Sequence, residues 1–260
     1  MADQFPDEDD KLWQYDNAQW TQLPKHMNHL PLVTKDIDLF SRLLRSIWAF
    51  FLKFFFTFYI RLTVVGDIKK TAREHPKLLV ISNHCSHLDQ VSIAAATPLR
   101  QTYSLYAAAA KDYFFSNRVK SFFSKHMIGA IPIDRGSKRG EAIKLCLQML
   151  EVMDRMWLIV FPEGTRSKDG KIHPFKRGVS LFAVKSNTSI LFLYLDGAYK
   201  LFPKGKAFPR PGALKIHVGP VHPPGPIHEI NLAYKKWVET INPEAFSDEK
   251  ISVPDKKEQN

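Results

Sequence analysis

The sequence LLVISNHCSHLD, residues 78–89, decides the fold class of the chain. Its apolar beginning, Leu78 to Ile81, predicts a short strand. The strand ends at Ser82, and a dense group of polar side chains follows at once, including His84 and Asp89. Open α/β sheets bind their ligands where the strands end. The stretch therefore predicts a strand that leads directly into a functional loop.

Strands and helices alternate on both sides of this stretch. We expect strands at residues 62–65, 78–82, 103–109, 131–133, 157–161, 190–195 and 214–218. We expect helices at residues 116–126, 142–153, 179–185 and 228–241, and apolar residues fall on one face of the second of these. The alternation predicts an α/β domain, in which a central, mostly parallel sheet is flanked by helices.

The boundaries of this domain follow from composition. We expect an acidic arm at residues 1–20, a helical membrane-association segment at residues 21–61, the α/β domain at residues 62–242 and a charged tail at residues 243–260. The arm resembles neither a secretory signal nor a transit peptide. Because the chain has only two cysteines, we expect no disulfide framework and a cytoplasmic location.

The charge of the chain restricts its partners. The formal net charge is +11, and residues 1–11 hold five acids and one lysine, so the rest of the chain carries about +15. This positive charge predicts an anionic partner, which can be nucleic acid, an anionic membrane surface or a phosphorylated ligand. Charge alone does not choose among these three.

Residues 37–65 are dense in Phe, Trp and Tyr, but cations interrupt them. The longest uncharged stretches have seven residues, against the ~20 needed to span a bilayer. The cations are Arg42, Arg45, Lys53 and Arg61, and the aromatic residues opposite them on a helix are Phe51, Phe54, Phe55 and Phe58. This pattern predicts a helix in the membrane interface, with cations at the head groups and aromatic rings toward the acyl chains. A covered core helix and a short span with a snorkelling lysine are the alternatives.

His84 and Asp89 together can act as a general base. If a helix begins near Ser86, the spacing brings the carboxylate back to the imidazole, fixes its tautomer and raises the basicity of the other ring nitrogen. Such a pair can remove a proton from an alcohol. In the alternative interpretation, Ser82, Asn83 and Ser86 cap the helix and the histidines are incidental.

The same loop allows two other chemistries. A zinc site would use His84, His87, Cys85 and Asp89, but no second pair of ligands with suitable spacing occurs elsewhere in the sequence. A Cys85 nucleophile would need a lowered thiol pKa, and apart from the neighbouring histidines nothing nearby in the sequence lowers it. We therefore expect neither a metal ion nor a thiol nucleophile.

A second polar stretch, FPEGTRS at residues 161–167, also follows an expected strand. Gly164 permits close backbone approach, Arg166 offers a planar fork for phosphate, and Glu163 can accept from a hydroxyl or hold the arginine. Two further basic clusters also follow apolar segments and lie beside glycine or proline. Their cations are Lys176, Arg177 and Arg135. The three clusters predict a phosphate-binding edge.

Taken together, these blocks resemble the glycerolipid acyltransferases, the family of 1-acylglycerol-3-phosphate acyltransferase. The matching residues are Asn83-His84-x-x-x-x-Asp89, GAIPIDR at 129–135, FPEGTR at 161–166 and FKRG at 175–178. Their order and spacing match over roughly residues 60–220, most of the chain. The family's later strand usually carries a Val-Pro-Val-type segment, whereas SILFLY at 189–194 has no proline. That departure leaves the identity of the substrate open.

The resemblance implies that His84 is the general base and that Asp89 orients it. A glycerol-backbone hydroxyl would then attack the thioester of acyl-CoA or acyl-carrier protein, without a covalent acyl-enzyme, a metal or another cofactor. The residues implied to bind the acceptor are Glu163, Gly164, Thr165, Arg166, Arg135 and Lys176. The implied reaction converts a lysophospholipid, first of all 1-acylglycerol 3-phosphate, to phosphatidic acid. The implied enzyme is a peripheral, monotopic protein that meets anionic lipids on the cytoplasmic face of a membrane.

Other functions fit parts of the same pattern. The acceptor could be glycerol 3-phosphate or another lyso-lipid, and a non-catalytic protein that binds anionic membranes would share the basic, aromatic surface. A nucleic-acid binder fits less well, because the aromatic residues concentrate in one apolar helix and do not alternate with Lys and Arg on a polar surface. The sequence leaves open the donor, the acyl chain length and the oligomeric state.

Overall fold

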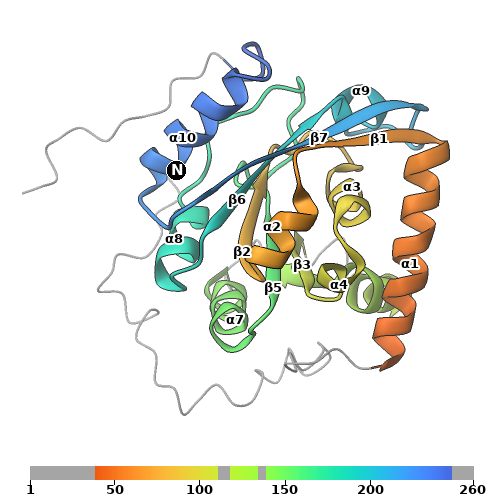
Figure 1. Cartoon of the computed structure of the whole chain (residues 1–260), viewed down its shortest axis with the longest axis horizontal. Coiled ribbons are helices and arrows are strands. Elements are labelled where there is room, and N and C mark those ends of the chain that lie inside the picture. The colour runs from red at the N-terminus through yellow and green to blue at the C-terminus, as the bar shows by residue number, and fades with distance from the viewer. Residues whose placement is uncertain (1–38, 111–117, 134–138, 248–260) are drawn as a thin grey trace, which may run out of the picture.

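The computed structural model describes residues 39–110, 118–133 and 139–247, whose strands form one seven-stranded sheet (Figure 1). The strands are β1 (Ile60–Val65), β2 (Lys77–Ser82), β3 (Leu105–Ala110), β4 (Ala130–Ile133), β5 (Met156–Val160), β6 (Ile190–Asp196) and β7 (Gly212–His222). Their order is β1-β7-β6-β2-β5-β3-β4, and every neighbouring pair is parallel except β6 and β7. The predicted α/β fold with a mostly parallel sheet is confirmed.

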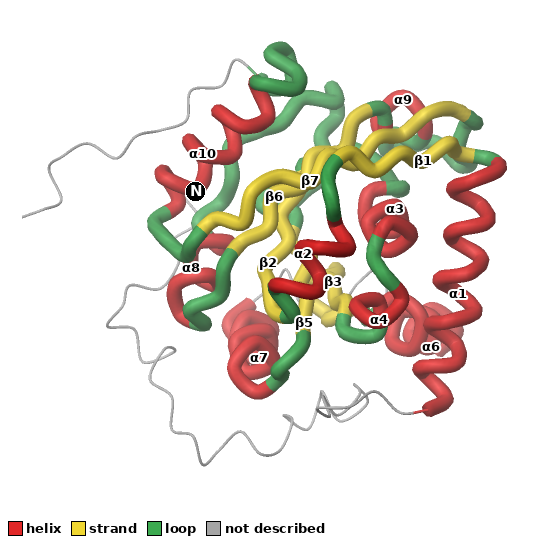
Figure 2. The backbone as a smooth tube through the Cα atoms, viewed as in Figure 1, coloured by secondary structure: helices red, strands yellow, loops and turns green. Residues whose placement is uncertain are grey.

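Helices cover both faces of this sheet (Figure 2). They are α1 (Leu39–Phe58), α2 (Ile68–Glu74), α3 (Asp89–Ala96), α4 (Leu99–Thr102), α6 (Arg118–Phe123), a π-helical turn η4 (Ser124–Ile128), α7 (Arg139–Val152), α8 (Gly178–Lys185), α9 (Ala198–Leu201) and α10 (Ile227–Glu239). The sequence pattern did not predict α2, α4 and α9, because four to seven residues are too few to show a helical period.

Strand β2 contributes to two separate cores. Leu79 and Ile81 pack into a core with α7, α8 and α10, whereas Leu78 and Val80 pack into a core with α1, α2 and α3. Successive side chains of a strand point to opposite faces, so an uninterrupted apolar run suits a strand that is covered on both sides. This double burial fixes the end of β2, and therefore the start of the functional loop.

The sheet brings the two predicted loops together. β2 and β5 are parallel neighbours, with Leu78 opposite Trp157 and Ile81 opposite Val160. Parallel neighbours end at the same edge of a sheet, so the segments that begin at Asn83 and at Phe161 lie side by side. Segments about 75 residues apart in the sequence thus form one site.

Helix α1 contradicts part of the membrane prediction. Arg45 does not face the head groups: it is only 4% exposed, and its guanidinium donates to the carbonyls of Tyr103 (2.7 Å) and His126 (3.3 Å). Arg61 belongs to β1 and not to the helix, and Phe55 is half-buried against the domain. The assignment of Arg45 to the head groups is therefore wrong, because the domain covers that side of the helix, and Phe55 is only partly open to solvent.

The rest of α1 has an exposed apolar face. At ~100° per residue its buried side lies within about 80° of arc, and the exposed apolar residues lie within about 120° on the opposite side. The buried residues are Ser41, Arg45, Ala49, Leu52 and Phe56. The exposed apolar residues are Leu39, Phe40, Leu43, Ile47, Phe50, Phe51, Phe54 and Phe58. We call this exposed set the α1 apolar face; Arg42 and Lys53, both exposed, flank it. Among the described residues, no helix has the length and apolarity to cross a membrane.

The expected tail begins later than predicted. Ala245 is buried, and residues 245–247 form a backbone bridge to Ile172, in which Ile172 N donates to Ala245 O (2.8 Å) and Ser247 N donates to Ile172 O (3.0 Å). The acidic arm at 1–20, the segment before residue 39, Arg135 and the last part of the tail lie outside the described residues.

Candidate active site

The loop after β2 holds His84 against Asp89. Asp89 is the first residue of α3 and is completely buried, and its Oδ2 lies 2.8 Å from Nδ1 of His84. The same oxygen accepts hydrogen bonds from the backbone N–H groups of Cys85 and Ser86, each at 2.8 Å. These backbone bonds hold the carboxylate at the start of the helix, where helix N–H groups favour negative charge. The structure therefore brings the predicted histidine and aspartate together.

His84 presents its other nitrogen outward. Its ring stacks on Phe161, with centroids 4.0 Å apart and planes at 15°, and the side chain stays partly exposed. When Nδ1–H donates to Asp89, Nε2 keeps its lone pair, and Nε2 has no hydrogen-bond partner among the described residues. This arrangement is that of a general base with an orienting carboxylate.

The neighbouring polar residues shape the loop. The Asn83 side chain bonds to the end of β6: Oδ1 accepts from Leu195 N (2.8 Å) and Nδ2 donates to Leu195 O (3.0 Å). The Ser86 hydroxyl donates to Phe202 O (2.8 Å) and accepts from Leu88 N (3.1 Å). Both side chains are buried and bond to backbone groups, and through these bonds they shape the loop.

Glu163 joins the two loops. Its Oε1 accepts from the backbone N–H of His84 (2.8 Å), and its Oε2 accepts from the backbone N–H of His173 (3.3 Å). Burial raises the pKa of this carboxyl to about 7, although both backbone hydrogen bonds favour the charged form. The sequence predicted a substrate ligand here. The structure adds a role in positioning, because both oxygens already hold protein backbone.

The rest of the FPEGTR block borders the same edge. Gly164 and Thr165 are exposed, and Gly164 has a φ of +73°. A Cβ on Gly164 would lie 3.1 Å from Nζ of Lys176, so a larger residue would displace that ammonium. The Lys176 backbone N–H donates to Pro162 O (2.9 Å), which fastens the second basic cluster to this block. Gly164, Thr165, Arg166 and Lys176 thus lie at the edge that carries His84.

His87 lies at this site, although the sequence analysis considered it only as a zinc ligand or an incidental residue. Its Nε2 accepts from Nη1 of Arg166, and its ring lies 4.7 Å from the ring of Phe202. Burial and the Arg166 charge lower the pKa of His87, which favours the neutral imidazole that can accept this bond. Its partner is far away in sequence, so spacing within the loop could not reveal the contact.

Cys85 faces away from this chemistry. Burial raises the pKa of its thiol, and the charges of Asp89 and Glu163 raise it further, so the thiol stays protonated. Together with Asn83 it lines a cavity of about 230 Å³ that His84 does not line. Among the described residues, no group of three or more His, Cys, Asp and Glu side chains could hold a metal ion.

Known proteins resemble this chain in sequence. A chloroplast 1-acyl-sn-glycerol-3-phosphate acyltransferase of Brassica napus is 32% identical over 48% of this chain and 34% of its own length. The Limnanthes douglasii 1-acyl-sn-glycerol-3-phosphate acyltransferase is 30% identical over 57% of this chain and 52% of its own length. The mouse 1-acyl-sn-glycerol-3-phosphate acyltransferase alpha is 29% identical over 55% of this chain and 48% of its own length. This chain thus spans about a third to a half of these relatives.

A solved structure shares the fold. The 1-acyl-sn-glycerophosphate acyltransferase of Thermotoga maritima superposes with a TM-score of 0.57 and 24% identity, over 77% of this chain and 78% of that one.

The α/β sheet carries a histidine and a buried aspartate, paired with each other, where its strands end. The family model named Acyltransferase matches residues 62–195, just over half of the chain, and this range includes both loops of the site. The protein belongs to the acyltransferase family.

Proposed function

We propose that this protein transfers a fatty acyl group from an acyl thioester to the free hydroxyl of a lysophospholipid. The acceptor proposed first is 1-acylglycerol 3-phosphate, which gives phosphatidic acid, and the donor is acyl-CoA or acyl-carrier protein. The observation that carries the proposal is the His84–Asp89 pair with an outward Nε2, beside a basic edge. The names of the relatives in sequence support the choice of acceptor.

The chemistry needs one base and no protein nucleophile. Nε2 of His84 takes the proton of the acceptor hydroxyl while its oxygen attacks the thioester carbonyl carbon, and Asp89 stabilises the resulting imidazolium. The tetrahedral intermediate then expels the thiolate, which receives the proton from His84 as the thiol leaves. The buried, protonated Cys85 is not required.

The acceptor phosphate binds at the cationic part of the edge. Arg166 offers a planar fork with two parallel N–H groups, and Lys176 adds a mobile point charge beside Gly164. Arg166 already rests on the neutral His87, which can hold the guanidinium without neutralising it. The proposed phosphate site is therefore ready before the acceptor arrives.

The acceptor and the acyl chain of the donor reside in or near membranes, so the enzyme needs a membrane surface. We propose a peripheral location on the cytoplasmic face, with the α1 apolar face in the acyl-chain boundary and Arg42 and Lys53 at anionic head groups. A helix of this kind holds the protein at the interface without crossing it.

The test combines donor consumption with product identification. Purified full-length protein is incubated with one acyl-CoA and a panel of acceptors: 1-acylglycerol 3-phosphate, glycerol 3-phosphate and other lyso-lipids. Free thiol is followed by absorbance and products by mass spectrometry. We expect thiol release with phosphatidic acid as the main product. His84→Ala should lose at least ~10²-fold in rate, whereas His228→Ala, on the exposed side of α10, should not.

Two outcomes contradict the proposal. Vesicle binding without thiol release from acyl-CoA or from acyl-carrier protein would favour a non-catalytic membrane-binding protein. Full activity in His84→Ala would exclude this histidine as the base. A different main product, such as 1-acylglycerol 3-phosphate formed from glycerol 3-phosphate, would change the acceptor and leave the reaction type intact.

A further inference from the structure

The segment between α9 and β7 carries an exposed aromatic residue among cations. We call residues 203–211, PKGKAFPRP, the basic loop. Phe208 at its tip is 82% exposed, and Lys204, Lys206 and Arg210 are also exposed. From residue 197 to residue 228 the sequence has no Asp or Glu. The positive charge of the loop is therefore not neutralised by acids from its own stretch of chain.

The chain holds this loop in a defined shape. Arg210 N donates to Leu201 O (2.9 Å) and closes its base, and Lys206 N donates to Pro203 O (3.3 Å) across a turn with Gly205 at a φ of +89°. The loop thus presents a large aromatic side chain to solvent on a base that backbone hydrogen bonds close.

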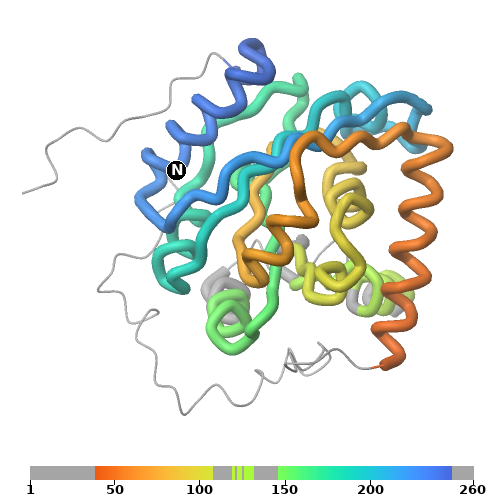
Figure 3. Tube along the Cα trace, viewed as in Figure 1, coloured from red at the N-terminus to blue at the C-terminus, as the bar shows by residue number. Residues whose placement is uncertain are grey.

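The basic loop continues the α1 apolar face. The hydroxyl of Tyr59, the residue after α1, donates to Pro209 O (2.9 Å). Figure 3 shows the loop beside the end of α1, at the edge of the molecule far from α10. Phe58, in the last turn of α1, is 74% exposed, so the exposed aromatic surface runs from the helix toward the loop.

The base of the loop contacts the catalytic loop. Phe202 O accepts from the hydroxyl of Ser86 (2.8 Å) and from the backbone N–H of His87 (3.2 Å), and Pro203 pairs with Ser86 in a backbone bridge. Phe202 and Pro203 thus connect the basic loop to the segment that carries His84. The family match ends at residue 195, before this loop.

We propose that the basic loop is a second membrane-contact element, which inserts Phe208 into an anionic bilayer while Lys204, Lys206 and Arg210 bind lipid phosphates. Together with α1 it makes a two-point contact that orients the catalytic edge toward the bilayer. Charge complementarity and continuity with the α1 apolar face select an anionic lipid surface as the partner. The inference rests on the proposed lipid substrate, but it is tested through binding and not through acyl transfer.

A labelled cysteine reports insertion directly. Phe208→Cys is coupled to an environment-sensitive fluorophore in the full-length protein, where the native Cys85 and Cys146 are buried. Leu232→Cys, at an exposed position on α10, is the matched control. On vesicles of phosphatidylcholine with phosphatidylglycerol, we expect a blue shift and quenching by chain-labelled lipid at position 208 only. A label at 208 that stays in water on vesicles that bind the protein overturns the proposal.

Charge reversal tests the cations. Lys204→Glu with Lys206→Glu should lower the partition coefficient on these vesicles at least ~10-fold, whereas Lys185→Glu with Lys236→Glu, the same change in net charge on α8 and α10, should change it less than ~2-fold. Equal losses in both pairs would mean that total charge alone binds the membrane, and would overturn the role of the loop. A Lys204→Glu, Lys206→Glu variant that loses binding to a short DNA duplex but keeps its binding to vesicles would also overturn the role of the loop. Unchanged thiol release with short-chain, monomeric substrates would show that catalysis stands apart from docking.

Discussion

At the residue scale, one oxygen of Asp89 makes three hydrogen bonds within the loop after β2. Oδ2 accepts from the His84 ring and from two backbone N–H groups, while Oδ1 is buried without a hydrogen-bond partner among the described residues. The geometry and the charge of this carboxylate can therefore be separated by experiment. An amide at the same position can still accept through one oxygen, but it cannot balance a positive imidazolium.

Asp89→Asn should lower the rate of acyl transfer by ~10²–10⁴-fold with only a small change in melting temperature, since the amide oxygen can still accept from the backbone and the charge on the base is lost. Thiol release from acyl-CoA gives the rate, and circular dichroism gives the melting temperature. The conservative Asp89→Glu serves as a control that keeps the charge and moves it. A rate equal to the wild type in Asp89→Asn would remove the aspartate from the mechanism.

Glu163 gives stability a pH dependence of defined sign. Burial raises the pKa of this carboxyl to about 7, so between its usual range and neutral pH the folded protein holds a proton that the unfolded chain has released. The free energy of unfolding should therefore fall as pH rises through this interval and stay constant above it, by roughly 3 kcal/mol at most.

Glu163→Gln removes this titration. The free energy of unfolding of the variant minus that of the wild type should increase from about pH 5 to about pH 8, because only the wild type acquires a buried charge in this interval. Urea unfolding of both proteins at these two pH values measures the difference. An equal stability gap at both values would mean that the carboxyl does not titrate in this range. Glu163→Ala should instead lose about 1–3 kcal/mol at either pH, since the N–H of His84 loses its acceptor.

At the scale of elements, α1 shows which features of a helix its sequence pattern predicts and which depend on tertiary packing. Its composition predicted an amphipathic helix with an aromatic face, and Phe51, Phe54 and Phe58 do lie on the exposed side. The pattern could not show that a cation would lie on the covered side. Arg45 is satisfied by carbonyls of Tyr103 and His126 and by the face of the Tyr106 ring, groups that only tertiary packing brings near.

The cations of α1 should therefore separate into two kinds. Arg45→Ala should destabilise the fold by about 2–4 kcal/mol, because it leaves buried carbonyls without a donor and opens a cavity. Thermal unfolding measures this loss. Arg42→Glu with Lys53→Glu should leave the melting temperature nearly unchanged and weaken sedimentation with anionic vesicles, most strongly at low salt. A stable Arg45→Ala protein, or surface reversals that sediment undiminished, would contradict this division.

At the scale of the whole molecule, the sequence predicted the strands of the sheet but not the order in which they pair. The apolar runs of β2, β5 and β6 located the core strands, and strand ends located both loops of the site. The order of strands and the antiparallel β7 depend on crossovers that no local pattern encodes. His87 with Arg166, and Glu163 with the backbone of His84, are likewise products of the β2–β5 pairing and not of spacing within either loop.

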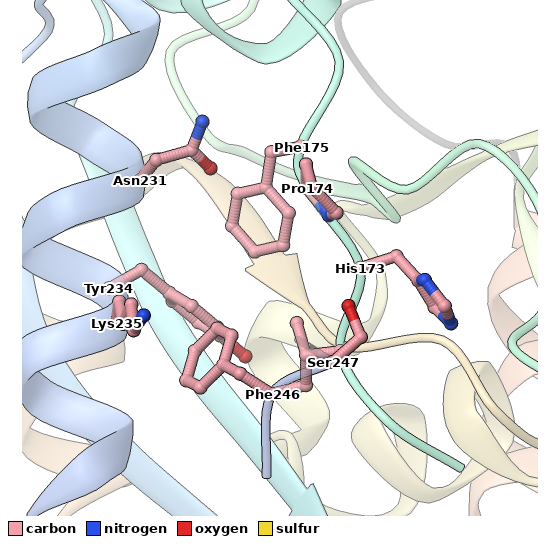
Figure 4. A pocket seen from close by; sticks show the side chains of 9 residues that line it. His173, Pro174, Phe175, Asn231, Tyr234, Lys235, Phe246 and Ser247 are labelled. Carbon is pink, nitrogen blue, oxygen red and sulfur yellow. The ribbon is translucent and has the colours of Figure 1, made fainter. Parts of the chain in front are cut away.

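The C-terminal segment after α10 packs between this helix and the segment that carries His173 and Phe175. Figure 4 shows Phe246 between α10 and the segment that carries His173 and Phe175. The Phe246 ring lies 6.4 Å from the ring of Tyr234 and 5.7 Å from Nζ of Lys235, and its neighbours bond to the backbone of Ile172. His173, the next residue, donates its backbone N–H to Glu163. The segment thus supports Glu163, which in turn holds the backbone of His84, the proposed base.

Phe246→Ala should cost about 1–3 kcal/mol, less than a fully buried Phe because the ring is only half-buried. Because the loss falls on the support of Glu163, kcat should fall severalfold at a temperature where the variant is still folded. Phe208→Ala removes the same ring from an exposed position and should leave both the melting temperature and the turnover of soluble substrates unchanged. Thermal unfolding and thiol release under identical conditions compare the two variants. If Phe246→Ala lost stability but kept full kcat, the segment would stabilise the fold without affecting the position of His84.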